Sequence, residues 1–154
     1  ARQVGGRGGV GGGVPACGAT GLAWVEIPGG GPRLQEHVYP LMGRVLAGGR
    51  TGMLETGGHR PTTRVPAAVL KIVDVKCPAS GEAAKNDYGN LDRLEPHDEV
   101  KFVVQDRADY DFARDVNARY ELPSRAAAVL LSPGPGVLGP KQPAQRLPAY
   151  LRPA

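Results

Sequence analysis

Short apolar runs, separated by polar or glycine-rich segments, dominate this chain of 154 residues. Five of the runs have the length and composition of β-strands, and each ends in small or charged residues. We expect Pro28 and the glycines that follow it to end the first strand, because proline lacks the N–H that a strand donates. The predicted strands are 22–27, 51–56, 70–76, 99–105 and 126–131.

A segment between the first two predicted strands has the 3.6-residue period of an amphipathic helix. Its apolar positions are Leu34, Val38, Leu41, Met42, Val45 and Leu46. Pro40 fits the first turn, so the regular helix is predicted to start near Glu36 or His37. The pair Gly48-Gly49 is predicted to end it.

A second helix is predicted after the fourth strand. Asp106 or Asp109 can cap its start by accepting hydrogen bonds from free N–H groups. Its predicted buried face has helical spacing and consists of Phe112, Ala113, Val116 and Tyr120. Single helical turns are predicted within 62–69 and at 91–94, in segments that are otherwise irregular.

The order of these elements indicates an α/β fold with a largely parallel sheet, because helical crossovers join parallel strands. Five strands are too few for a closed eight-stranded barrel, so an open or partial barrel is predicted. The proposed organisation is a glycine-rich disordered segment (1–21), a partial barrel (22–138) and a proline-rich tail (139–154). Seven of the first thirteen residues are glycine, and six of the last twenty-two are proline.

The distribution of charged residues and the small number of cysteines bear on which ligands and which cellular location are expected. The formal net charge is +4, yet residues 61–122 carry nine Lys/Arg against twelve Asp/Glu. The basic excess lies at the ends without interleaved aromatic residues, so nucleic-acid binding is not expected. No apolar run of membrane-spanning length and no signal peptide is recognisable, which favours a cytoplasmic protein without membrane contact. Cys17 and Cys77 cannot form a disulfide framework or a four-cysteine metal site, so no metal ligands are predicted.

Several charged side chains lie inside strands that are otherwise rich in Val and Ile, where burial of an unpaired charge is costly. Two explanations stay open: they line a polar cavity at the carboxyl ends of the strands, or each pairs with a neighbour or lies at an exposed edge. The glycines after Pro28 fit neither a phosphate-binding loop nor a dinucleotide fingerprint. The charged positions are Glu26, Glu55, Asp74, Lys76 and Lys101.

Several motifs within residues 22–138 together form a long and specific match to one enzyme family. They are Leu54-Glu55-Thr56-Gly57-Gly58-His59-Arg60, Lys71-Ile72-Val73-Asp74-Val75-Lys76-Cys77-Pro78-Ala79-Ser80-Gly81-Glu82, His97-Asp98-Glu99-Val100-Lys101-Phe102-Val103, Asp106-Arg107-Ala108-Asp109-Tyr110, Leu131-Ser132-Pro133 and Gly136-Val137-Leu138. With them, the chain resembles 7-carboxy-7-deazaguanine synthase, a radical S-adenosylmethionine enzyme of queuosine and 7-deazapurine biosynthesis.

The resemblance implies an incomplete barrel of the radical S-adenosylmethionine type in a homodimer. It implies conversion of 6-carboxy-5,6,7,8-tetrahydropterin to 7-carboxy-7-deazaguanine by ring contraction with loss of ammonia, a lyase reaction. The implied cofactors are S-adenosylmethionine, a four-iron four-sulfur cluster and magnesium.

The resemblance also assigns candidate site residues. Gly29 and Gly30 match the start of a Gly-Gly-Glu-Pro turn that binds the methionine end of S-adenosylmethionine. The other cofactor-binding candidates are Glu55, Thr56, Asp74, Lys76 and Ser132, and the substrate-binding candidates are Pro28, Lys101 and Pro133.

Three departures from the family pattern bear on activity. Gly31 replaces the glutamate of the turn, and Pro28 replaces a threonine that contacts substrate. The three-cysteine cluster motif, which in the family precedes the first strand, is not found in this sequence. We therefore expect weak or no S-adenosylmethionine binding and no catalysis by this chain alone. The alternatives are an incomplete or degenerate synthase, a non-catalytic nucleotide- or partner-binding α/β domain, and a structural domain without ligand.

Overall fold

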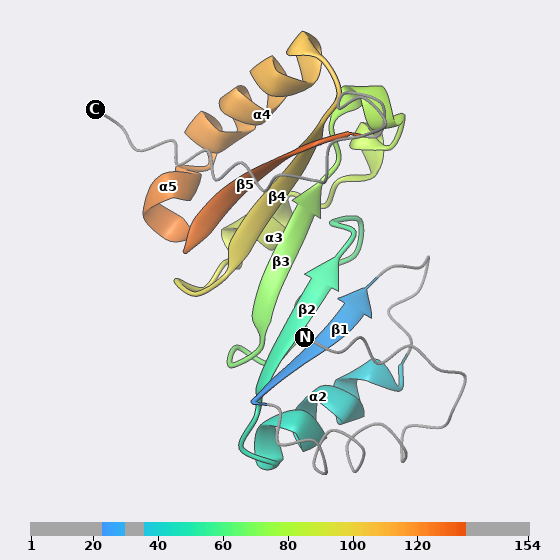
Figure 1. The fold of residues 1–154 in the computed structure, drawn as a ribbon, viewed down its shortest axis with the longest axis vertical. Helices are drawn as coiled ribbons and strands as arrows, with labels where there is room; N and C mark the ends of the chain where they lie inside the picture. Colours follow the sequence, from blue (N-terminus) through green and yellow to red (C-terminus); the bar gives the residue numbers. More distant parts are fainter. Residues whose placement is uncertain (1–22, 30–35, 135–154) are drawn as a thin grey trace, which may run out of the picture.

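The computed structural model describes residues 23–29 and 36–134, which form a five-stranded sheet with helices packed against it (Figure 1). Neighbouring strands are all parallel and follow the order β1-β2-β3-β4-β5, so the predicted α/β class and parallel sheet are confirmed. The sheet is not closed, because β1 and β5 form its two edges. The segments 1–21 and 139–154 lie outside the described residues, so their predicted disorder stays a prediction.

The bounds of the elements agree with most of the predicted ones. In chain order they are β1 (Trp24–Gly29), α2 (Val38–Ala47), β2 (Thr51–Thr56), β3 (Leu70–Val75), the 3₁₀ turns η1 (Pro78–Ser80) and η2 (Ala83–Lys85), α3 (Gly89–Asp92), β4 (Glu99–Val104), α4 (Arg107–Arg119), α5 (Leu122–Arg125) and β5 (Ala128–Pro133). None of the helices in 23–29 and 36–134 is long and apolar enough to cross a bilayer.

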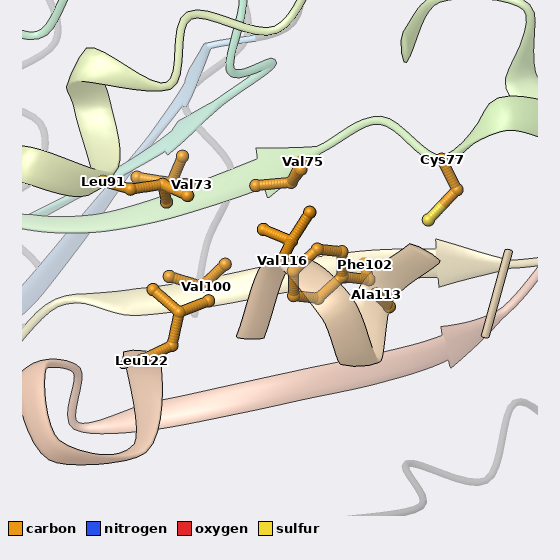
Figure 2. Packing of buried hydrophobic residues seen from close by; sticks show 9 residues of the cluster. All are labelled: Val73, Val75, Cys77, Leu91, Val100, Phe102, Ala113, Val116 and Leu122. Atoms are coloured by element: carbon orange, nitrogen blue, oxygen red, sulfur yellow. The ribbon is translucent and has the colours of Figure 1, made fainter. Parts of the chain in front are cut away.

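Helices cover one face of the sheet. Strands β2 and β3 alternate strictly between buried and half-buried residues, and the register places the buried ones on the same face. One apolar cluster joins α2 to β1 and β2 around Met42, Val45 and Leu54. A second joins β3 and β4 to α3, α4 and α5 around Phe102, Val116 and Leu122 (Figure 2). The opposite face presents the half-buried residues, which include the charged side chains in the strands except Lys71, which lies on the helix-covered face.

Strand β1 reaches two residues further toward its carboxyl end than predicted. Pro28 and Gly29 were expected to end it, but they continue the strand and pair with Glu55 and Thr56 of β2. The prediction was wrong because β1 is an edge strand, where a proline can turn its missing N–H side away from the neighbour. The carboxyl end of β1 therefore lies directly beside that of β2.

Two other predictions about local structure need correction. The segment 62–69 contains two turns, closed by Val65 N–H to Thr62 O and Val69 N–H to Pro66 O, but no helix. A helix is disfavoured there because Pro66 restricts the residue before it. The fifth strand begins at Ala128, two residues later than predicted, because α5 occupies the connection before it.

The capping prediction for α4 is confirmed for Asp106. The Asp106 side chain accepts a hydrogen bond from the N–H of Asp109 at 2.9 Å. On the predicted inner face, Ala113 and Val116 are buried, whereas Phe112 and Tyr120 are partly buried against the same cluster. The helix is thereby fixed at its start and along its length against β4.

Candidate functional site

The strand ends on the uncovered face of the sheet form a small polar pocket. It has a volume of about 130 Å³ and lies where β2, β3 and β4 meet. Its lining residues are Glu55, Thr56, Gly57, Ile72, Asp74, Lys76 and Lys101. Ligand sites in open parallel sheets lie at the carboxyl ends of strands, so the position fits a binding site.

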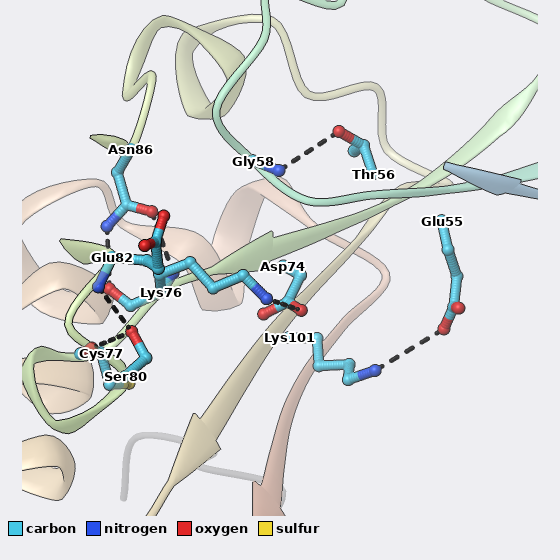
Figure 3. A network of polar contacts seen from close by, with 10 residues as sticks. All are labelled: Glu55, Thr56, Gly58, Asp74, Lys76, Cys77, Ser80, Glu82, Asn86 and Lys101. Atoms are coloured by element: carbon cyan, nitrogen blue, oxygen red, sulfur yellow. Dashed lines mark hydrogen bonds and ion pairs between the residues drawn. The ribbon is translucent and has the colours of Figure 1, made fainter. Parts of the chain in front are cut away.

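Two ion pairs organise the charges of this pocket (Figure 3). The Lys76 ammonium donates to Asp74 Oδ2 at 2.7 Å. Lys101 Nζ lies 3.6 Å from Glu55 Oε1, beyond normal hydrogen-bond length, and the pair spans β3. Two acids and two bases thus give the pocket a balanced charge, which suits a ligand that carries both signs.

The second oxygen of Asp74 is unusual. Asp74 Oδ1 is buried and has no hydrogen-bond partner among the described residues. A buried carboxylate oxygen without a donor costs free energy unless a ligand or water satisfies it. The oxygen therefore marks a place where a donor from a bound molecule would be stabilised. Its neighbour Lys101 stands opposite Asp74 in the sheet register.

The loops behind the pocket are held by side chains for which the sequence predicted no such role. Asn86 forms two hydrogen bonds with the backbone of Lys76, and buried Asn90 binds the carbonyls of Gly58 and Arg60. The buried Asp109 carboxylate accepts from the N–H groups of Ala79 and Gln105. Asparagine and aspartate commonly bind loop backbone, but sequence alone does not show which loop they bind.

The structure brings some of the predicted site residues together and leaves others apart. Glu55, Asp74, Lys76 and Lys101 meet in the pocket. Thr56 also lines it, but its hydroxyl accepts a hydrogen bond from Gly58 N–H at 3.2 Å, and the residue is buried on the helix-covered side. The threonine hydroxyl is thus already engaged in shaping the loop after β2.

The other predicted residues that the structure describes lie around the pocket rather than in its lining. Pro28 and Gly29 flank Glu55 and Thr56 through the pairing of β1 with β2. Ser132 and Pro133 pair with the last two residues of β4, beyond Lys101. Gly30 and Gly31 lie outside the described residues, as does Cys17. Glu26 faces the same side of β1 as Pro28 but is not among the lining residues.

The described residues do not fit an iron–sulfur cluster. Such a cluster needs several cysteine thiolates, and the only cysteine in 23–29 and 36–134 is Cys77. It is buried, and burial together with the nearby Asp109 carboxylate raises the pKa of its thiol to about 12, so the thiol stays protonated. The described ranges also hold no group of three His, Cys, Asp or Glu side chains suited to a metal ion.

Comparison with known proteins identifies relatives of one kind. A protein of Koribacter versatilis (strain Ellin345) named 7-carboxy-7-deazaguanine synthase is 52% identical over 110 residues, which cover 71% of this chain and 49% of that protein. Proteins with the same name from Chlorobaculum tepidum and Methanospirillum hungatei are 34% identical over 120 residues and 36% identical over 94 residues. They cover 76% and 60% of this chain, and 54% and 39% of the relatives.

The matched region covers most of this chain but only part of each relative. This chain spans about half the length of the curated relatives it matches. No model of a known protein family matches the chain. The shared residues show that this chain is related to these proteins. The activity of a whole relative does not follow from a match to half of it.

Proposed function

Since the chain belongs, over its matched stretch, to the 7-carboxy-7-deazaguanine synthase family, we propose that its sheet is the ligand-facing part of a radical S-adenosylmethionine barrel. A complete enzyme of this kind would be a cytoplasmic homodimer. It would convert 6-carboxy-5,6,7,8-tetrahydropterin to 7-carboxy-7-deazaguanine. The observation that carries the proposal is the pocket of Glu55, Asp74, Lys76 and Lys101 at the strand ends.

The pocket suits a polar end of a ligand rather than a whole cofactor. Its volume of about 130 Å³ is smaller than the roughly 300–1,000 Å³ of a typical small-molecule site. Asp74 Oδ1, which has no hydrogen-bond partner among the described residues, can accept a hydrogen bond from a ligand amino group. The long Glu55–Lys101 pair can separate, so that each side chain binds the ligand group of opposite charge. S-adenosylmethionine carries an amino group, a carboxylate and ribose hydroxyls, and all of these are compatible with such a set.

Each residue is assigned a binding role and no chemical step. Asp74 and Glu55 would accept hydrogen bonds from S-adenosylmethionine, and Lys76 would hold the Asp74 carboxylate in place. Lys101 would face the carboxylate of the pterin. A four-iron four-sulfur cluster would supply the electron for cleavage of S-adenosylmethionine. The described residues do not fit that cluster, so we assign no step through it to this chain.

Binding can be tested directly on the full chain by ¹H–¹⁵N nuclear magnetic resonance with S-adenosylmethionine. Concentrations up to about 10 mM would detect even a complex with a free energy near −4 kcal/mol. Shifts are expected for the amides of Glu55, Gly57 and Asp74, and none for Lys71 at the opposite end of β3. An absence of shifts at the strand ends would overturn the proposal.

Weak affinity is part of the proposal. Gly31 replaces the glutamate that the family pattern provides for the amino group of S-adenosylmethionine. Micromolar affinity by calorimetry, about −8 kcal/mol, would contradict it. A Gly31→Glu variant is expected to bind more tightly than the chain itself, and Gly43→Glu, at an exposed position of α2 where an added Cβ meets nothing within 4 Å, provides a control for the added charge.

Catalysis by the chain alone is not expected. After anaerobic treatment with iron and sulfide, we expect no cluster absorbance and no product by mass spectrometry, with the Koribacter versatilis relative as positive control. Product formation by this chain would contradict the expectation that it is inactive on its own. Ligand binding without product would equally suit the second candidate, a non-catalytic nucleotide- or partner-binding domain. That candidate needs no iron–sulfur cluster, which agrees with a Cys77 thiol that is buried and has a raised pKa.

A further inference from the structure

Lys76 lies just beyond the end of a strand, where backbone groups usually lose their partners. Strand β3 ends at Val75, so the N–H and C=O of Lys76 are outside the ladder with β4. Yet the Lys76 side chain shares a face with Asp74 and reaches it at 2.7 Å. This i, i+2 contact requires the chain to stay extended through Lys76.

Asn86 provides the missing partner. Its Oδ1 accepts the Lys76 N–H at 2.9 Å, and its Nδ2 donates to the Lys76 carbonyl at 2.9 Å. One side-chain amide thus satisfies both backbone groups of one residue, as a peptide of an adjacent strand would. The 3₁₀ turn η2 ends just before Asn86 and presents this amide to the end of β3.

The same loop also fixes the neighbouring strand end. The N–H of Asp87 donates to Gly58 O at 2.8 Å, in the loop that follows β2. Gly58 has a positive φ of 75°, and a Cβ there would collide with the Asp74 carbonyl. Asn86 and Asp87 therefore hold the loops after β2 and β3 in contact at the pocket.

From this geometry we infer that Asn86 is a positioning residue for the pocket: it keeps β3 extended through Lys76, so that the ammonium reaches Asp74. Asn86 is not among the residues that line the pocket, so it acts through Lys76 rather than by touching a ligand. The inference rests on the proposed function only for the identity of what binds there.

The test compares the full chain with Asn86→Ala by nuclear magnetic resonance without ligand. The readout is the nuclear Overhauser contact between the Hε protons of Lys76 and the Hβ protons of Asp74. We expect this contact in the chain itself and its loss in Asn86→Ala. Asn117→Ala serves as the control, because Asn117 lies on α4, is itself buried, and its Oδ1 accepts no hydrogen bond from the described residues.

A second variant keeps the test decisive if Asn86→Ala is poorly folded. Asn86→Asp retains the acceptor for Lys76 N–H but loses the donor to Lys76 O, so a contact of intermediate intensity is expected. Unchanged amide signals of Lys71 and Ala127, at the opposite end of the sheet, show that the fold is intact. A contact of full intensity in either variant would overturn the inference.

The outcome is separable from that of the proposed function. S-adenosylmethionine is titrated into the chain and into each variant after the ligand-free spectra. If the ligand binds, the affinity of Asn86→Ala should fall about tenfold, equivalent to about 1.4 kcal/mol. If the ligand does not bind even the unaltered chain, the proposed function fails, while the ligand-free Lys76 contact still decides the role of Asn86.

Discussion

The ammonium of Lys71 lies 2.7 Å from Asp98 Oδ2, and both side chains are almost completely buried, at 4% and 0% exposure. The Asp98 carboxylate also accepts the N–H of Lys71 at 2.7 Å and that of Glu95 at 2.8 Å. The Asp98 carbonyl accepts from Ala127, just before β5. This single acid therefore joins the starts of three strands, at the end of the sheet opposite the pocket.

Removal of one member of this pair should destabilise the fold strongly. Lys71→Met keeps the apolar stem but leaves the buried Asp98 carboxylate without the ammonium that pairs with it. We expect the free energy of unfolding to fall by about 3–5 kcal/mol, measured by urea unfolding with circular dichroism. The control is Glu36→Gln, which breaks the exposed Arg64–Glu36 pair and should leave the free energy of unfolding nearly unchanged, because water and salt screen that pair. Equal losses in the two variants would contradict the structural role of Lys71 and Asp98.

A second prediction compares two glycines that share a left-handed backbone conformation but differ in their steric surroundings. Gly58 and Gly49 both have positive φ, at 75° and 68°. A Cβ on Gly58 meets the Asp74 carbonyl, whereas a Cβ on Gly49 meets nothing within 4 Å. Gly49→Ala should cost about 1–2 kcal/mol, from the left-handed conformation alone. Gly58→Ala should cost about 1–3 kcal/mol more, because the strand end must move.

Thermal and urea unfolding of the two alanine variants provide the measurement for this prediction. Gly58→Ala should also shift the amide signals of Asp74 and Lys76, which Gly49→Ala should leave unchanged. Equal stability of the two variants would show that the loop after β2 is not held against β3 in solution.

The sheet could be predicted from the sequence because its signals are local. Apolar runs bounded by polar or glycine-rich segments mark the strands, but residue type alone does not give the buried face, since Lys71 is buried in β3 and Ile72 is only half-buried. Asp74 and Lys76 lie two positions apart in an extended chain and therefore share a face, as their ion pair shows. The predicted cap at Asp106 was likewise local, because it depends on an N–H three residues away.

Features that depend on distant contacts could not be predicted in the same way. Pro28 continues β1 because that strand lies at the sheet edge, which is a property of the assembled sheet. Asn90 binds the N–H of Thr62 across 28 positions in the sequence, and no local pattern indicates that partner. The candidate site itself was found through charged residues in apolar strands and through family motifs. These signals identify the residues that could bind a ligand, but not the loops that hold those residues in place.

A third prediction concerns the proposed substrate side of the pocket. Among the described residues, the one charged contact of Lys101 is the long 3.6 Å approach to Glu55, so its ammonium can turn to a ligand carboxylate. Lys101→Met should weaken binding of 6-carboxypterin about tenfold or more, because a charge-assisted hydrogen bond contributes about 1.5–3 kcal/mol. Ligand fluorescence measures the affinity. Pterin without the carboxylate is the control and should bind both forms equally; a matching loss for both ligands would contradict this role of Lys101.

The last prediction uses the thiol of Cys77, whose pKa is raised from 9.0 to about 12 by burial and by the Asp109 carboxylate. A thiol with a raised pKa in the folded state keeps its proton while the unfolded chain loses it. The unfolded state therefore binds fewer protons between these two values, and stability falls as pH rises above about 9. The maximum slope is about 1.4 kcal/mol per pH unit.

Cys77→Ala removes this pH dependence and leaves every other titrating group in place. Urea unfolding of both proteins from about pH 8 to pH 10.5 should show the stability of the unaltered chain falling relative to the variant by about 2 kcal/mol. The difference isolates Cys77, because lysine, tyrosine and Cys17 contribute equally to both curves. Parallel curves would mean that the thiol titrates normally and that the contact between the β3 exit and α4 opens readily in solution.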